Sequence, residues 1–230
     1  MEYRVEKKFL CSEQQLQLLQ ARLLSAISWD AHQGDNDRYL IRSVYFDNFD
    51  NSLYYENDAG VDDRSKYRIR AYNCGADVIH MEIKSKLHGY CHKESATLTR
   101  PEFEQIMAGE IPSYGKDRSK TFNRFCLQMA MHRLHPAVIV EYERTAFVYP
   151  VGNVRITFDR NISYSYDFGS FFDPQMPATP ILPVNRHILE VKYDEVLPDF
   201  LAQLLELNSL QQSTFSKYYM ARQLETENRR

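Results

Sequence analysis

The chain has 230 residues, of which 43% are hydrophobic and 26% charged, and its formal net charge is −3. A chain of this length and composition can bury a hydrophobic core, so global disorder is not expected. The slightly acidic balance argues against a general nucleic-acid binder, which is usually basic overall, and we expect no nucleic-acid partner.

The first ten residues, MEYRVEKKFL, lack the apolar run of a signal peptide. No segment approaches the roughly 18 apolar residues that a membrane-spanning helix requires. We therefore expect a soluble, cytoplasmic protein without a membrane span. The four cysteines are widely spaced and form no C-x-x-C pair. We expect reduced, structural thiols, and neither disulfides nor a zinc site.

The amino-terminal half predicts strands joined to one helix. We expect strands at Tyr3–Cys11 and Tyr39–Phe46, and three more between Lys66 and Glu94. A helix is expected from Ser12 to about Ile27, opened by a capping box of Ser12 and Gln15. The polar segment His32–Arg38 is expected to be a loop.

The carboxyl-terminal half predicts helices and strands in turn. We expect helices from a Thr99–Glu102 capping box to Gly109, and at Ser119–Leu134, Pro198–Leu207 and Phe215–Glu227. Strands are expected at Ala137–Tyr149, Val154–Arg160 and His187–Tyr193, with a short one at Ser163–Phe168. The proline-rich segment Phe171–Pro183 is expected to be irregular. This order indicates one α+β domain over residues 1–230, with eight or nine antiparallel strands.

The stretch Lys66–Glu94 alternates charged with apolar or small residues. Successive side chains of a strand point to opposite faces, so Arg68 and Arg70 share one face while Ile69 lies on the other. The same parity recurs along the chain and collects a largely basic set: Glu6, Lys8, Arg68, Arg70, Glu82, Lys84, Lys93, Arg144, Arg155, Asp159 and Glu190.

Two interpretations of this set are open. On a solvated sheet face, each of these charges would contribute little. Inside a closed barrel, the bases would repel one another and require a polyanion. Phosphate chains suit Arg and Lys, and the carboxylates could hold a divalent metal that also binds phosphate oxygens.

Eight segments in order carry a family resemblance: RVEKKF, YFDNFDNSLYY, KYRIRAY, MEIKSK, YERTAF, VRITFD, LEVKY and FSKYY. The chain resembles the catalytic domain of the vacuolar transporter chaperone (VTC) family, the polyphosphate polymerases, within the triphosphate tunnel metalloenzymes. The resemblance implies a CYTH-like fold, a closed antiparallel β-barrel with flanking helices that encloses a basic tunnel.

The resemblance also implies roles for individual residues. It implies catalytic phosphate contacts by Arg68, Arg70, Lys84, Arg144 and Arg155, and substrate binding by Lys8, Lys93, Ser216 and Lys217. Glu190 matches the metal-ligand position, with Glu6 and Glu82 as weaker candidates, for Mn²⁺ or Mg²⁺. The E-x-E-x-K start of the triphosphatases is replaced here by Arg4-Val-Glu6-Lys-Lys8, which favours the polymerase branch.

The function implied is metal-dependent transfer of the terminal phosphoryl group of a nucleoside triphosphate to polyphosphate, without a protein nucleophile. Two alternatives remain, hydrolysis of tripolyphosphate or a nucleoside triphosphate, and binding of polyphosphate without catalysis. The sequence indicates no oligomeric state.

Three other candidates favour ordinary structural roles. Glu141 and Glu143 lie on the opposite parity from Arg144, which indicates salt bridges outside the charged face. His187 lies three residues from Glu190, and on a strand this spacing points the two side chains to opposite faces. The sequence contains no P-loop and no G-x-G-x-x-G fingerprint.

Overall fold

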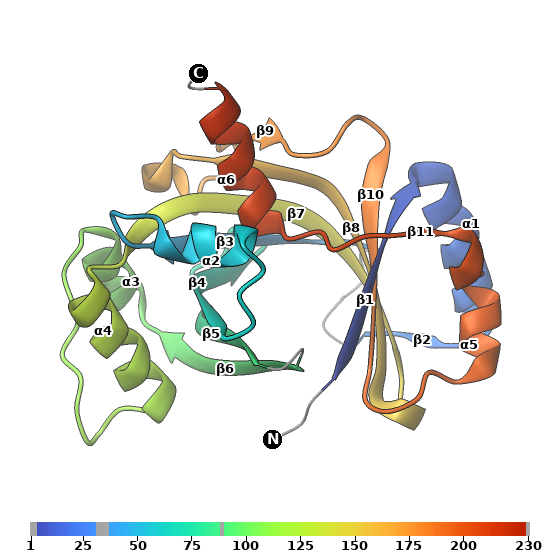
Figure 1. Ribbon diagram of the computed structural model, residues 1–230, viewed down its shortest axis with the longest axis horizontal. Coiled ribbons are helices and arrows are strands. Elements are labelled where there is room, and N and C mark those ends of the chain that lie inside the picture. Colours follow the sequence, from blue (N-terminus) through green and yellow to red (C-terminus); the bar gives the residue numbers. More distant parts are fainter. Residues whose placement is uncertain (1–3, 31–36, 88–89, 229–230) are drawn as a thin grey trace. The chain divides into compact units, whose positions relative to one another are not determined.

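A computed structural model describes residues 4–30, 37–87 and 90–228, so most of the expected loop at His32–Arg38 lies outside the described residues. The fold is α+β, a large antiparallel sheet with flanking helices, as expected (Figure 1). The chain forms two compact units: unit 1 is Met1–Leu40, Tyr142–Ile162 and Pro180–Ser216, and unit 2 is Ile41–Glu141, Ser163–Thr179 and Lys217–Arg230.

Eleven strands are described: β1 Val5–Ser12, β2 Ser28–Trp29, β3 Tyr39–Asp47, β4 Arg64–Tyr72, β5 Ile79–Leu87, β6 Tyr90–Leu98, β7 His135–Tyr149, β8 Val154–Ser165, β9 Thr179–Pro180, β10 Arg186–Tyr193 and β11 Gln211–Gln212. They pair in the order β11-β1-β10-β8-β7-β3-β4-β5-β6, with β2 beside β7 and β9 beside β8. Strands β3, β7 and β8 contribute residues to both units, so no single linker divides the chain.

The expectation of a closed barrel is wrong. In the part of the chain that the structure describes, the pairing order ends at β11 and β6, and these two strands do not pair with each other. The second edge of β1 is instead covered by the two-residue strand β11, which pairs with Phe9 and Leu10. Parity fixes the faces of each strand but carries no information on which strands pair, so closure could not be derived from it.

Unit 1 packs two helices, α1 (Glu13–Leu24) and α5 (Asp199–Leu204), against one sheet face. The two helices lie side by side over β1 and β10 (Figure 1). The capping box of Ser12 and Gln15 is confirmed. The hydrophobic core between helices and sheet contains Leu16, Phe147, Phe158 and Leu189, all at most 3% exposed. Because these residues take one face of each strand, the alternate residues must lie on the other face.

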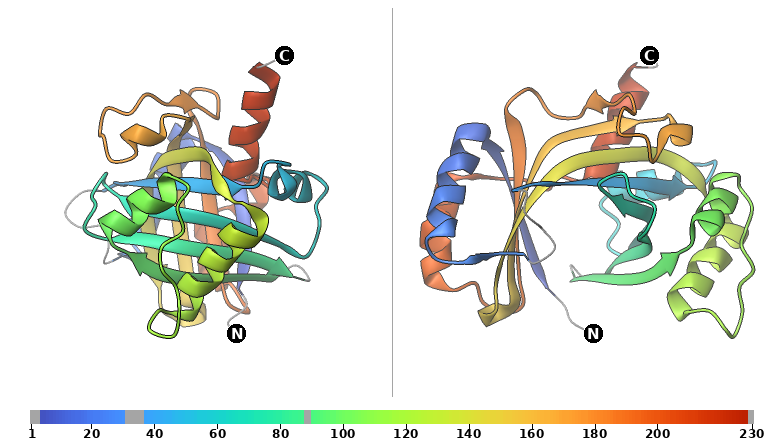
Figure 2. Two further views of the ribbon diagram at one scale, coloured as in Figure 1. Left: turned by 90° about the vertical axis from the view of Figure 1, so that its left-hand side faces the viewer. Right: turned by 180° about the vertical axis from the view of Figure 1, so that it is seen from behind.

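Unit 2 repeats this arrangement with other elements. Helices α3 (Arg100–Met107) and α4 (Lys120–His132) cover one face of β4, β5 and β6 (Figure 2, left). The Thr99–Glu102 capping box is confirmed. The core there includes Ile69, Met81 and Phe125, each 0% exposed. The charged residues of β4 and β5 therefore occupy the opposite face, as parity predicted.

Helix α2 (Ser52–Asp58) follows β3 and was not expected from the sequence. Its first turn is stabilised by a residue outside it. The buried Asp47 carboxylate accepts hydrogen bonds from the backbone N–H groups of Leu53 and Tyr54, at 3.0 and 3.1 Å. Tyr218, on α6 (Lys217–Asn228), donates its hydroxyl to the same carboxylate and holds α6 against α2.

The short strand expected at Ser163–Phe168 is correct only as far as Ser165, where it forms the end of β8 and not a separate strand, and a 3₁₀ turn follows at Phe168–Ser170. Two further 3₁₀ turns lie at Val151–Asn153 and Leu207–Ser209. Among the helices described, none has both the length and the apolar composition needed to cross a membrane. The four cysteines, Cys11, Cys74, Cys91 and Cys126, are free thiols.

Candidate functional site

The charged face of unit 1 carries a mixed-charge cluster on β1, β10, β8 and β7, comprising Glu6, Lys8, Arg144, Arg155, Asp159, Glu190 and Lys192. The strand register places several of these residues directly opposite one another, in rows that run across the strands. Lys8 lies opposite Glu190, which lies opposite Thr157. In the next row, Glu6 lies opposite Lys192 and Lys192 opposite Arg155. Opposed side chains on antiparallel strands are close enough to interact.

Ion pairs join these rows. The Lys192 ammonium is 3.0 Å from the Glu190 carboxylate and 3.5 Å from that of Glu6, and Lys8 is 3.0 Å from Glu6. Burial alone would lower the pKa of Lys8, but the charges of Glu190 and Glu6 outweigh it and raise that pKa above its usual range. Lys8 also donates to the Phe215 carbonyl at 2.9 Å. It is therefore held as a fixed positive charge.

Arg144 is the most enclosed base of the mixed-charge cluster. Its side chain is 8% exposed, lies 2.7 Å from Asp159, and is 3.5 Å from Glu190. Burial would lower the pKa of this guanidinium, but Asp159 raises it well above its usual value. Arg155 is more exposed and pairs with Asp30 at 2.6 Å. The mixed-charge cluster thus contains four bases and three carboxylates.

Unit 2 carries a second group, the arginine cluster, comprising Arg68, Arg70, Glu82 and Lys93. All three bases surround the Glu82 carboxylate, at 2.6 Å for Arg68, 3.9 Å for Arg70 and 3.2 Å for Lys93. Glu82 is 2% exposed. Burial would raise the pKa of Glu82, but the charges of Arg68, Arg70 and Lys93 outweigh burial and hold it far below its usual range. Glu82 is therefore ionised and fixes the bases around it.

A row of three lysines lies next to the arginine cluster. Lys84 on β5 lies directly opposite Lys66 on β4 and Lys93 on β6. Like charges placed opposite one another on a sheet repel. Three strands therefore place lysines at one level of the sheet, and one of them, Lys93, also pairs with Glu82.

The remaining expected residues stand where α6 begins. Ser216 is half-buried at the end of the last segment of unit 1, and Lys217 opens α6 in unit 2. Tyr218 stacks on Tyr45 at 5.3 Å between ring centroids, and Tyr45 in turn accepts a hydrogen bond from Arg68 at 3.1 Å. The start of α6 is thus linked to the arginine cluster inside unit 2.

The structural roles expected for three other residues are confirmed. Glu141 accepts from the buried Arg42 at 2.7 Å, and Glu143 from Arg38 at 3.2 Å. His187 lies 3.1 Å from Glu13, on the face opposite Glu190. These contacts belong to the helix-covered side of the sheet.

The carboxylates differ in their suitability for a metal. No group of three or more His, Cys, Asp or Glu side chains able to hold a metal occurs among the described residues. Mg²⁺ and similar ions, however, are commonly bound through one or two carboxylates together with substrate phosphates and water. Glu6 and Glu190 lie on one face of the sheet and supply two such carboxylates, and each already contacts two bases: Lys8 and Lys192 for Glu6, and Arg144 and Lys192 for Glu190. Glu82 contacts three bases, Arg68, Arg70 and Lys93, and is the most heavily compensated of the three carboxylates.

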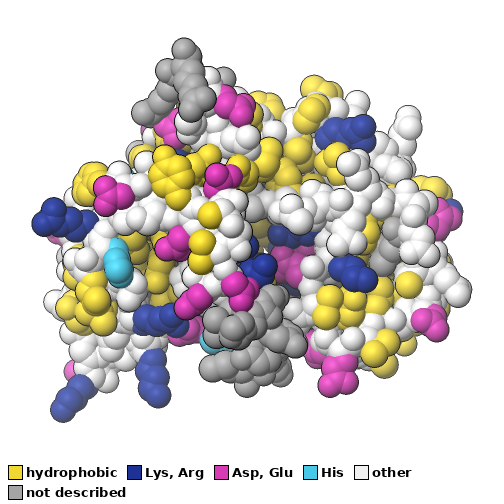
Figure 3. All heavy atoms as spheres, viewed as in Figure 1, with side chains coloured by type: hydrophobic (Ala, Val, Ile, Leu, Met, Phe, Trp, Pro, Cys, Tyr) yellow, Lys and Arg dark blue, Asp and Glu magenta, His cyan; other side chains and the backbone are white. Residues whose placement is uncertain are grey.

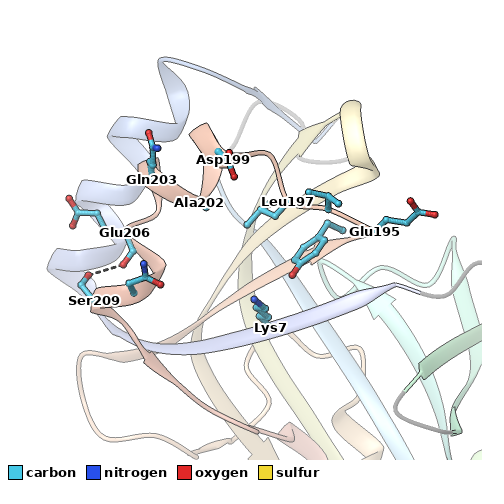
Figure 4. A pocket seen from close by; sticks show the side chains of 11 residues that line it. Lys7, Glu195, Leu197, Asp199, Ala202, Gln203, Glu206 and Ser209 are labelled. Atoms are coloured by element: carbon cyan, nitrogen blue, oxygen red, sulfur yellow. Dashed lines mark hydrogen bonds between the residues drawn. The ribbon is translucent and has the colours of Figure 1, made fainter.

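The other side of unit 1 has an open pocket of about 750 Å³ (Figure 4). Lys7 reaches it from β1, and Asp199, Gln203 and Glu206 from the α5 side. Glu195 adds another carboxylate. Lys7 alternates with Lys8 along β1, so this pocket lies across the sheet from the mixed-charge cluster. Its excess of carboxylates does not suit a phosphate ligand.

On the face shown in Figure 3, Lys and Arg side chains are interspersed with Asp and Glu side chains. This mixture is typical of an ordinary solvated surface.

The site contains three residues that had not been assigned roles. Strand parity had already placed Asp159 on the charged face with Arg155, and it places Lys192 there with Glu190, but neither residue had been given a role in the site. Asp30, the partner of Arg155, follows β2 in a segment without a periodic pattern. Nothing in the sequence indicated this contact.

Comparisons with known proteins bear on both fold and family. The sequence profile of the VTC domain matches residues 3–225. A crystal structure of a protein from Bacillus halodurans, proposed to be an adenylate cyclase, has a similar fold, with a TM-score of 0.54, 17% identity and coverage of 94% of each chain. The PH1819 protein of Pyrococcus horikoshii gives a TM-score of 0.48 at 11% identity, covering 97% of this chain and 99% of its own. No curated protein matches significantly.

Proposed function

Because the chain belongs to the VTC domain family, we propose that it is a phosphoryl-handling enzyme of the triphosphate-tunnel type. The proposed reaction moves the terminal phosphoryl group of a nucleoside triphosphate to an oxygen of inorganic phosphate or polyphosphate. One observation supports this proposal most: in a chain with a net charge of −3, Lys66, Lys84 and Lys93 lie opposite one another on neighbouring strands, next to Arg68 and Arg70. Bases gathered in this way can bind phosphate oxygens.

The proposed mechanism uses charge and position. Lys84, Lys93, Arg68 and Arg70 bind phosphate oxygens in unit 2, and Lys8, Arg144 and Arg155 do so in unit 1, with Ser216 and Lys217 as further contacts. The bond between the terminal phosphorus and its bridging oxygen breaks as an acceptor oxygen attacks in line, and the nucleoside diphosphate leaves. The acceptor is already an anion, so no protein nucleophile is required.

Glu190 and Glu6 are the residues proposed to hold Mn²⁺ or Mg²⁺, which would supply positive charge at phosphate oxygens when bound. Glu82 is proposed to position the bases of the arginine cluster, since all three of them contact its carboxylate.

The test is to incubate the purified protein with ATP and Mn²⁺, with and without a short polyphosphate primer, and to separate the products on a gel. Chain growth with release of ADP supports the proposal. Orthophosphate release without chain growth assigns hydrolysis instead, and binding of triphosphate without either product assigns a polyanion-binding module. Since the Bacillus halodurans protein is proposed to be an adenylate cyclase, cyclic AMP is measured in the same reactions.

A matched pair of variants tests the site as well as the activity. Lys8 and Lys7 are neighbours on β1 but point to opposite faces. Lys8→Ala should lose turnover, whereas Lys7→Ala, which changes the pocket of Figure 4, should keep it. Equal turnover in the two variants would remove the mixed-charge cluster from the mechanism.

A further inference from the structure

The side chain of Thr157 on β8 is buried without a hydrogen-bond partner. The residue is 3% exposed, and its hydroxyl forms no hydrogen bond with any of the described residues. Buried polar groups in folded proteins are nearly always hydrogen-bonded, and leaving one unsatisfied destabilises the fold. An unpaired hydroxyl at such a position calls for a partner that comes from outside the chain.

Thr157 stands in the middle of the mixed-charge cluster. It lies opposite Glu190, which lies opposite Lys8, so the three residues form one row across β8, β10 and β1. Arg155 and Asp159 flank it on the same face of β8. The neighbouring residues Ile156 and Phe158 point into the hydrophobic core instead. The hydroxyl is therefore directed to the charged face.

Another buried threonine in unit 1 shows how the fold satisfies a hydroxyl when its role is structural. Thr145, 0% exposed, donates to the Asp37 carbonyl at 2.9 Å and accepts from Arg160 at 2.9 Å. Valine has nearly the same shape as threonine and would fill the Thr157 position without an unsatisfied group. The two threonines therefore differ: the hydroxyl of Thr145 is hydrogen-bonded within the protein, and that of Thr157 is not.

The surrounding charges indicate what the missing partner is. Four bases, Lys8, Arg144, Arg155 and Lys192, lie on this face with three carboxylates, Glu6, Asp159 and Glu190. The bases outnumber the carboxylates, and a hydroxyl beside them can donate a hydrogen bond to an anionic oxygen that the bases attract. We infer that the Thr157 hydroxyl donates a hydrogen bond to a phosphoryl oxygen of a triphosphate bound along the Lys8–Glu190–Thr157 row. This inference rests on the proposed function and adds a contact to its site.

The experiment compares Thr157→Val with Thr157→Ser and with Thr179→Val, a change at an exposed position. Binding of tripolyphosphate to the full chain is measured by calorimetry, without metal and with Mn²⁺, and melting temperature is measured without ligand. Thr157→Val should bind about tenfold more weakly in both conditions, which corresponds to one charge-assisted hydrogen bond. Thr157→Ser, which keeps the hydroxyl, should bind within about threefold of the wild type.

A further readout separates binding from folding. Without ligand, Thr157→Val should melt at or above the wild-type temperature, because the unsatisfied hydroxyl is removed. Unchanged binding by Thr157→Val overturns the inference while the proposed function stands. A loss confined to the Mn²⁺ condition overturns it in favour of metal coordination by the hydroxyl. If the wild type binds no tripolyphosphate, the proposed function fails and the inference fails with it.

Discussion

Arg144 donates two hydrogen bonds to Asp159, from Nε to Oδ1 at 2.7 Å and from Nη2 to Oδ2 at 2.8 Å. The two residues come from β7 and β8, and both side chains are at most 8% exposed. This bidentate geometry fixes the guanidinium plane beside Glu190. Because the Arg144 side chain is already immobilised, binding of a phosphate to it would carry little further cost in side-chain entropy.

Removing the charge of Asp159 should therefore be costly. Asp159→Asn leaves the buried Arg144 with only the more distant Glu190 carboxylate, at 3.5 Å, as its charge partner, and should lower the free energy of unfolding by about 3 kcal/mol. Urea denaturation measures the change. The control is Asp194→Asn, whose pair with Arg4 is more exposed, with side chains 38% and 29% accessible, and which should cost at most about 1 kcal/mol. Equal effects of the two variants would contradict a special role for the buried pair.

Glu82 should make stability depend on pH in the acidic range. Its pKa is lower in the folded protein than in the unfolded chain, where it is about 4.3. The stabilisation is thus fully present above that value and is lost as the pH falls toward the folded pKa. The wild type should lose stability below about pH 5, and Glu82→Gln should lose less over the same range.

The measurement for Glu82 is the free energy of unfolding between pH 7 and pH 3. At pH 7, Glu82→Gln should already be destabilised by about 3–5 kcal/mol, because Arg68, Arg70 and Lys93 lose their shared carboxylate. Glu104→Gln is the control, since its pair with Arg100 is exposed. The idea is wrong if the pH profiles of the wild type and Glu82→Gln are parallel.

Lys84→Ala should lower activity. The lysine is proposed to contact phosphate, so turnover should fall by about 100-fold or more. Lys66 and Lys93, which lie opposite it on the neighbouring strands, remain in this variant. Steady-state kinetics tests the expectation and circular dichroism confirms folding, with Lys120→Ala, an exposed position on α4, as the control. A fully active Lys84→Ala protein would remove this residue from the site.

Arg70→Ala should also lose turnover by orders of magnitude, but with a cost in stability. Arg70 contacts both Ser43, at 3.2 Å, and Glu82. Arg70→Lys keeps the charge but not the planar fork and should recover only part of the activity. Circular dichroism confirms that each variant is folded. An active, well-folded Arg70→Ala protein would show that Arg70 is not required for phosphate binding or turnover.

His187 should destabilise the fold below neutral pH. Burial lowers its pKa, and although Glu13 acts in the opposite direction, Arg160 and Arg38 add to the lowering. The unfolded chain, with a pKa of about 6.5, then binds the proton first, so stability falls as the pH drops below that value. His187→Gln should show a smaller loss between pH 7 and pH 5, whereas His132→Gln, at an exposed position, should follow the wild type.

Much of the local structure followed from the sequence. The capping boxes at Ser12 and Thr99 lie within reach of their own backbone, so their helices begin where the pattern predicts. Helix α2 was missed because Asp47, the residue that caps it, lies outside the helix and inside the preceding strand. A local pattern cannot reveal a cap that depends on the path of the chain.

By itself, the sequence determined which side chains of each strand share a face, because side chains alternate along any extended backbone. This alternation alone placed Lys8 with Glu6, and Arg68 with Arg70. Only the tertiary structure decided which strands pair and in what register, and so which charges meet: Lys84 with two lysines, Glu190 with Thr157, and Arg155 with Asp30. It also decided that the described strands do not close into a barrel. Pairing and register depend on contacts between segments far apart in the sequence, which strand periodicity does not encode.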